Sequence, residues 1–175
     1  NVGQRWADLD PLKRTERPNI PDLDPAYYGF TDADQETVFD TSNTFFGKKT
    51  MPLRELLNAL RETYCGTIGA EFMYTSEQSE KRWWQEKLES IRSKPNFTAE
   101  KKKDILERLT AAEGLERYLH TKYVGQKRFS LEGGESFIAA MDELILSAGA
   151  QGVQEVVIGM AHRGRLNVLV NTMSK

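Results

Sequence analysis

The sequence is poor in the residues that build disulfide frameworks and metal centres, with one cysteine and two histidines. A single cysteine cannot form an internal disulfide, so we expect a reducing compartment: the cytoplasm of a bacterium, or the mitochondrial matrix of a eukaryote. Cys65 has no adjacent base, which favours a helix or core position over a nucleophile. His120 has no second histidine or cysteine at metal-ligand spacing and is predicted to lie on the surface.

Neither sign of charge dominates, and no apolar run is long. The 24 Lys and Arg residues against 26 Asp and Glu residues provide no long-range attraction for nucleic acid or an anionic membrane. The apolar stretches, such as Glu155–Ala161, are far shorter than the roughly 20 residues that span a bilayer. The basic run Lys101–Lys103 has no interleaved Arg and aromatic residues, so a solvated helix face is favoured over a nucleic-acid patch. We therefore expect no nucleic-acid partner and no membrane.

Three regions follow one another along the chain. Residues 1–50 are rich in proline and aromatic side chains and are predicted to form an extended arm that lies across another surface. Residues 51–125 are predicted to be helical, with helices from Pro52 to about Cys65, from Glu77 to Ser93 and from Thr98 onward. Gly114 is expected to kink or divide the third of these helices.

The character of the sequence changes in residues 126–175, where an α/β domain is predicted to start. A helix containing Phe137 and Ala148 should end at Gly149 or Gly152. Glu155–Ala161 is apolar over the length of a strand, which predicts a parallel strand buried on both faces. A further helix should begin near Leu166. The fold class is therefore α/β, with a mostly helical first part that leads into the first strand and helix of a sheet.

The segment between that strand and that helix carries the main candidate site. Ligands of parallel sheets gather at the carboxyl ends of strands, and a helix start there favours an anion. Arg163 and Arg165 add charged donors, Gly164 permits a sharp turn, and His162 supplies an imidazole that exchanges protons near neutral pH. The pattern predicts an anion site beside an acid/base or hydrogen-bonding group.

Other interpretations of these residues stay open at this point. Both arginines could instead pair with carboxylates such as Glu155 or Asp142, and His162 could merely bond a backbone carbonyl. Glu132 could be catalytic, although a turn or capping role is favoured. The sequence has no Walker loop, no Gly-x-Ser-x-Gly and no zinc pattern.

Several long motifs resemble, in order, a known enzyme family. The segments are Asp10–Lys13, Leu23–Pro25, Tyr64–Met73, Lys127–Gly133 and Gly159–Leu169. Together they resemble the thiamine-diphosphate-dependent first component of the 2-oxoglutarate dehydrogenase complex, and the resemblance covers essentially the whole chain.

The resemblance implies an oxidoreductase of the tricarboxylic acid cycle. Members decarboxylate 2-oxoglutarate with thiamine diphosphate and Mg²⁺, pass the succinyl group to lipoyl groups of the dihydrolipoyl succinyltransferase component, and work as homodimers. By this similarity His162 is a catalytic residue that helps to bind and orient the substrate or its enamine intermediate, and Arg163 contacts the cofactor diphosphate or the substrate carboxylate. Arg165 and Gly164 support the loop.

The family's Gly-Asp-Gly metal motif, its activating glutamate and its second substrate histidine are not in these 175 residues. We therefore expect the cofactor and metal ligands to lie outside this segment, and the segment alone to be inactive. A second hypothesis is a non-catalytic interaction module, in which the arm and helices dock a partner subunit.

Overall fold

We analysed a computed structural model, which describes residues 2–175. The chain forms two compact units, Asn1–Asn96 and Phe97–Lys175, and each is described by itself. This boundary lies between residues 96 and 97. The domain limits expected from the sequence, at residues 50 and 125, stay predictions. No helix in residues 2–175 is both long enough and apolar enough to cross a membrane.

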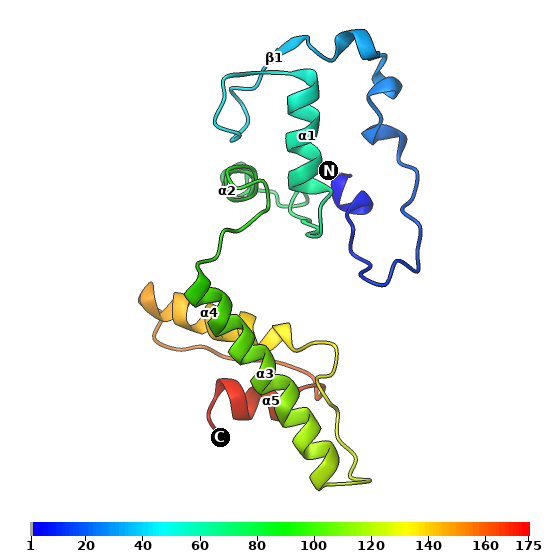
Figure 1. Cartoon of the computed structure of the whole chain (residues 1–175). Helices are drawn as coiled ribbons and strands as arrows, with labels where there is room; N and C mark the ends of the chain where they lie inside the picture. The colour runs from blue at the N-terminus through cyan, green and yellow to red at the C-terminus, as the bar shows by residue number, and fades with distance from the viewer. Residues whose placement is uncertain (1) are drawn as a thin grey trace. The chain divides into compact units, whose positions relative to one another are not determined.

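The first unit begins with an arm of short helical turns (Figure 1). Its four 3-10 helices are η1 (Gly3–Trp6), η2 (Pro21–Leu23), η3 (Pro25–Tyr28) and η4 (Asp32–Asp34). The arm packs against the chain just after helix α1 (Leu53–Tyr64), where the Asp8 N–H donates to the Gly66 carbonyl at 2.8 Å. Ile20 is buried, whereas Leu9 and Leu12 are exposed, so the arm buries only some of its apolar side chains.

A two-stranded antiparallel sheet follows, and the sequence did not predict it. β1 (Val38–Asp40) pairs with β2 (Thr50–Pro52), and Phe39 lies opposite Met51. The buried Thr41 holds the connecting loop closed, because its N–H donates to the Lys49 carbonyl and its hydroxyl to the Lys48 carbonyl, both at 2.8 Å. Each strand has three residues, which is too short for an alternating pattern to stand out.

Two helices complete the first unit, and both were predicted. α1 (Leu53–Tyr64) begins directly after Pro52, which needs no N–H partner there, and ends at Cys65. α2 (Gln78–Glu89) starts after Glu77 and ends at Glu89, shortly before Arg92 and Ser93, which adopt positive φ. Cys65 is buried, and its burial raises the pKa of the thiol, in line with a structural role.

The second unit is built on the long helix α3 (Ala99–Lys122). The helix begins directly after Thr98, where its start was predicted, and Thr98 caps it, since its side chain accepts from the Lys101 N–H at 3.1 Å. The expected division of the helix at Gly114 is wrong: the helix runs through this residue without interruption. His120 is exposed, as predicted.

α4 (Ser136–Ala150) packs against α3 and ends before Gly152, which has a φ of 91°. After it the chain has no regular secondary structure until α5 (Arg165–Asn167), which continues as the π-helix η5 (Val168–Thr172). The core of this unit comprises Ala112, Leu131, Ile138 and Val168, with Met160 packed against it.

The buried strand predicted over Glu155–Ala161 is therefore wrong for this chain. Figure 1 draws the segment as coil, and Val157 is 95% exposed. A parallel strand needs a neighbouring strand to accept its backbone hydrogen bonds, and residues 97–175 contain none in the structure.

Candidate functional site

The predicted site lies on a turn that is fastened to the segment before α4. The Gly164 N–H donates to the Phe129 carbonyl at 2.9 Å, and the Arg163 guanidinium donates to the Ser130 carbonyl at 3.2 Å. The His162 ring lies against the Phe129 ring, with centroids 3.8 Å apart and planes tilted by 45°. Residues 129–131 thus form a platform on which His162 and Arg163 rest.

Gly164 occupies a position in this turn that favours glycine for two reasons. Its φ of 73° lies in the left-handed region, and a Cβ built on it would come within 2.5 Å of the Leu131 Cδ1 atom. Leu131 is buried in the core of the unit, so the turn approaches the platform as closely as a glycine allows. α5 starts at the next residue.

A buried carboxylate ties the platform, α3 and α5 together. Glu116, which is 3% exposed, accepts the Leu131 N–H at 3.1 Å and the Asn167 side-chain amide at 3.1 Å. The Arg128 guanidinium lies 3.4 Å from its other oxygen and neutralises the charge. Asn167 also donates to the Ala112 carbonyl at 2.9 Å. This network positions Leu131 of the platform and Asn167 of α5 relative to α3.

The charged groups of the turn are exposed. His162, Arg163 and Arg165 face solvent, while Gly164 between them is buried. Within residues 2–175 neither Arg163 nor Arg165 forms an ion pair, and Asp142 pairs with Arg108 at 2.8 Å. The alternative in which both arginines are neutralised by Glu155 or Asp142 is therefore not what the structure shows. Two guanidinium groups and one imidazole remain accessible to an anion.

The other candidate residues have ordinary roles. The Glu132 side chain is 66% exposed and lies 3.7 Å from the Arg128 guanidinium, which is a loose surface contact. The part of the chain that the structure describes has no group of three or more His, Cys, Asp or Glu side chains placed to hold a metal ion.

Sequence reasoning missed the supporting side of the site. Phe129 and Ser130 were noted only within a family motif, and Glu116 was not singled out. One signal was present: Glu116 lies four residues after Ala112 and next to Leu115, on the stripe of α3 that should face the core. A charged residue at such a position indicates a buried partner.

The sequence of the chain was compared with those of known proteins. No protein-family model matches it. It is 78% identical to the 2-oxoglutarate dehydrogenase E1 component of Cupriavidus necator over all 175 residues. It is 51% identical to the protein of that name from Azotobacter vinelandii and 48% identical to that from Haemophilus influenzae, in each case over 99% of the chain. The resemblance to the 2-oxoglutarate dehydrogenase E1 component is confirmed.

The chain spans less than a fifth of the length of these E1 components, with 18%, 18% and 19% of each relative covered. The match includes the His162 turn and its platform, because it runs over the full chain. The E1 relatives are enzymes by name, and the segment compared here is one part of them.

Proposed function

We propose that the chain is a segment of a 2-oxoglutarate dehydrogenase E1 component, and that its turn at residues 162–165 forms part of the active site. The whole enzyme would carry out the oxidative decarboxylation of 2-oxoglutarate and transfer the succinyl group to lipoyl groups of the second component of the complex. A homodimer with thiamine diphosphate and Mg²⁺ belongs to the same proposal. The thiamine ring, when bound, supplies the electron sink for the decarboxylation.

The observation that carries the proposal is the exposed positive charge of the turn. Within residues 2–175 the Arg163 guanidinium donates to the Ser130 carbonyl and forms no ion pair, so its remaining N–H groups are available for a carboxylate or a diphosphate. His162 is exposed and supported on one side by Phe129, which fixes the ring without consuming either nitrogen atom. In this proposal Arg163 binds the anionic group and His162 orients the substrate, while Gly164 and Arg165 support the loop.

Arg163→Ala, in the longer protein that contains this segment, should weaken the use of 2-oxoglutarate or thiamine diphosphate. The loss should be about 1.5–3 kcal/mol, which is the size of a charged hydrogen bond. Steady-state kinetics with each ligand varied in turn measures kcat/KM for both. Arg117→Ala is the matched control, because Arg117 is an exposed arginine of α3 that pairs with Glu113. Equal kinetics for the two variants would contradict the assignment.

His162→Ala should lower turnover of 2-oxoglutarate by about tenfold or more, as loss of an orienting hydrogen bond implies. Its effect on stability should be about 1 kcal/mol, because the ring contributes mainly its stacking on Phe129. Turnover and denaturant unfolding are measured on the same preparations. His162→Phe keeps an aromatic ring against Phe129, so normal turnover in that variant would show that His162 is only a packing residue.

A further inference from the structure

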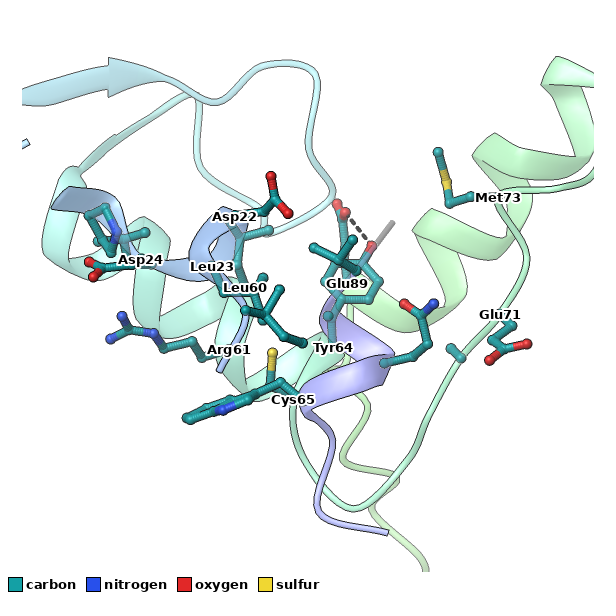
Figure 2. A pocket seen from close by; sticks show the side chains of 18 of the residues that line it. Asp22, Leu23, Asp24, Leu60, Arg61, Tyr64, Cys65, Glu71, Met73 and Glu89 are labelled. Atoms are coloured by element: carbon teal, nitrogen blue, oxygen red, sulfur yellow. Dashed lines mark hydrogen bonds between the residues drawn. The ribbon is translucent and has the colours of Figure 1, made fainter. Parts of the chain in front are cut away.

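The first unit contains a pocket that plays no part in the proposed function. Its volume is about 970 Å³, near the upper end of the roughly 300–1,000 Å³ typical of small-molecule sites. It is bounded by the arm, by the last two turns of α1, by residues 70–74 and by the end of α2. Figure 2 shows its side chains, with Tyr64 and Glu89 joined by a hydrogen bond.

The walls of the pocket combine aliphatic and aromatic surface. Trp6 and Tyr28 come from the arm, Leu60 and Tyr64 come from α1, and Phe72 comes from the segment after it. The Tyr64 and Phe72 rings lie 6.4 Å apart between centroids. Such walls favour a ligand with an apolar body, and aromatic faces also attract a cation.

A buried carboxylate supplies the polar part of the pocket. Glu89, which is 6% exposed, accepts the Phe45 N–H at 2.8 Å through one oxygen and the Tyr64 hydroxyl at 2.7 Å through the other. No Lys or Arg of residues 2–175 forms an ion pair with it. Burial and the neighbouring Glu89 carboxylate raise the pKa of Tyr64, so its hydroxyl remains a donor to Glu89. A buried charge with hydrogen bonds but no counter-ion is favourable for a cation.

The other charged side chains that line the pocket are mostly acidic, like Glu89. Four carboxylates, Asp22, Asp24, Glu71 and Glu89, line the pocket, against a single guanidinium, Arg61. A second guanidinium, that of Arg17, lies 4.8 Å from the Trp6 ring centroid, so the four carboxylates still outnumber the basic groups and favour a cation over an anion.

We propose that this pocket binds a small organic ammonium ion with an aromatic or branched aliphatic body. The apolar body occupies the walls, and the ammonium group lies toward Glu89 and Asp22. The site is separate from the His162 turn, so the proposal stands whether or not the turn binds the E1 substrate.

Three probes of one shape test the charge of the ligand: 2-phenylethylamine, neutral 2-phenylethanol and anionic 3-phenylpropionate. Each is titrated into the 175-residue chain while the indole N–H resonances are followed by NMR. Trp6 lines the pocket, whereas Trp83 and Trp84 do not, so its signal reports binding at this place. The amine should shift the Trp6 resonance and bind at least about tenfold more tightly than the alcohol, in proportion to a charged hydrogen bond. Equal binding of amine and alcohol, tighter binding of the carboxylate, or no shift of Trp6 would each overturn the proposal.

Glu89→Gln should lower the affinity for 2-phenylethylamine by about tenfold and leave that for 2-phenylethanol unchanged. Glu86→Gln, on the exposed side of the same helix, is the matched control and should leave both affinities unchanged. Asp22→Asn is a second variant at an exposed position, where folding is not at risk, and should weaken the amine alone by about threefold. Unaltered amine binding by Asp22→Asn would overturn the role of the carboxylates, even if Glu89→Gln proved poorly folded.

Discussion

Glu116→Ala should lower the free energy of unfolding of the second unit by about 3–5 kcal/mol, the cost of breaking a buried ion pair by removing one partner. The substitution leaves the Arg128 guanidinium, which is 15% exposed, without its carboxylate. It also leaves the Leu131 N–H without an acceptor and removes one of the two acceptors of the Asn167 amide. These groups connect α3 to the platform and to α5. When the second unit unfolds, the His162 turn should therefore no longer be held by residues 129–131.

Amide hydrogen exchange of α3 and α4, together with far-ultraviolet circular dichroism in urea, measures this loss. Tryptophan fluorescence should change little, because all three tryptophans lie in the first unit. Glu113→Ala is the matched control: Glu113 lies on the same helix, is exposed, and forms a surface pair with Arg117, so its loss should cost at most about 0.5 kcal/mol. Similar exchange rates in the two variants would show that the buried network does not hold the unit together.

The helices were predictable because their signals are local. Pro52 before α1 and Thr98 at the start of α3 are boundary residues whose effect does not depend on the rest of the fold. Gly114 shows the limit of such reasoning. A glycine costs a helix about 1 kcal/mol, and a helix of 24 residues packed along one side can carry that cost without breaking.

The strand expected over Glu155–Ala161 failed for a different reason. Its apolar continuity describes an environment with neighbours on both faces, and that environment has to be supplied by other strands. In the second unit the neighbours are absent, and Val157 is exposed. The apolar run thus indicates a preference for a buried strand, and residues 97–175 provide no neighbouring strand for it.

The candidate site was predictable in part. The chemistry of His162 and Arg163 could be inferred from the turn itself, since residue type and a helix start are local features. Their support could not, because Phe129 and Glu116 reach the turn only through tertiary packing, 33 and 46 positions earlier in the sequence. The pocket of the first unit was out of reach for the same reason, since four separate segments enclose it.

Gly164→Ala should be nearly as damaging as the loss of Glu116, because two independent costs add at one position. The left-handed backbone costs a residue with a Cβ about 1–2 kcal/mol. The Cβ would also approach the Leu131 Cδ1 atom to 2.5 Å and its Cβ to 3.3 Å, and overpacking in a core costs about 1–3 kcal/mol. A total of about 2–5 kcal/mol is therefore expected in urea unfolding of the second unit.

Two other glycines of the same unit separate these costs. Gly133 has a φ of 86° but nothing within 4 Å of a built Cβ, so Gly133→Ala should show the backbone cost alone. Gly114 lies in α3 with open space around it, so Gly114→Ala should stabilise the unit by about 0.5–1 kcal/mol. If Gly164→Ala cost no more than Gly133→Ala, Leu131 would have moved aside, and the platform would not fix the turn. A loss well beyond that of Gly133→Ala, accompanied by a change in the His162 ring resonances, would show that the close approach of Gly164 to Leu131 holds His162 and Arg163 in place.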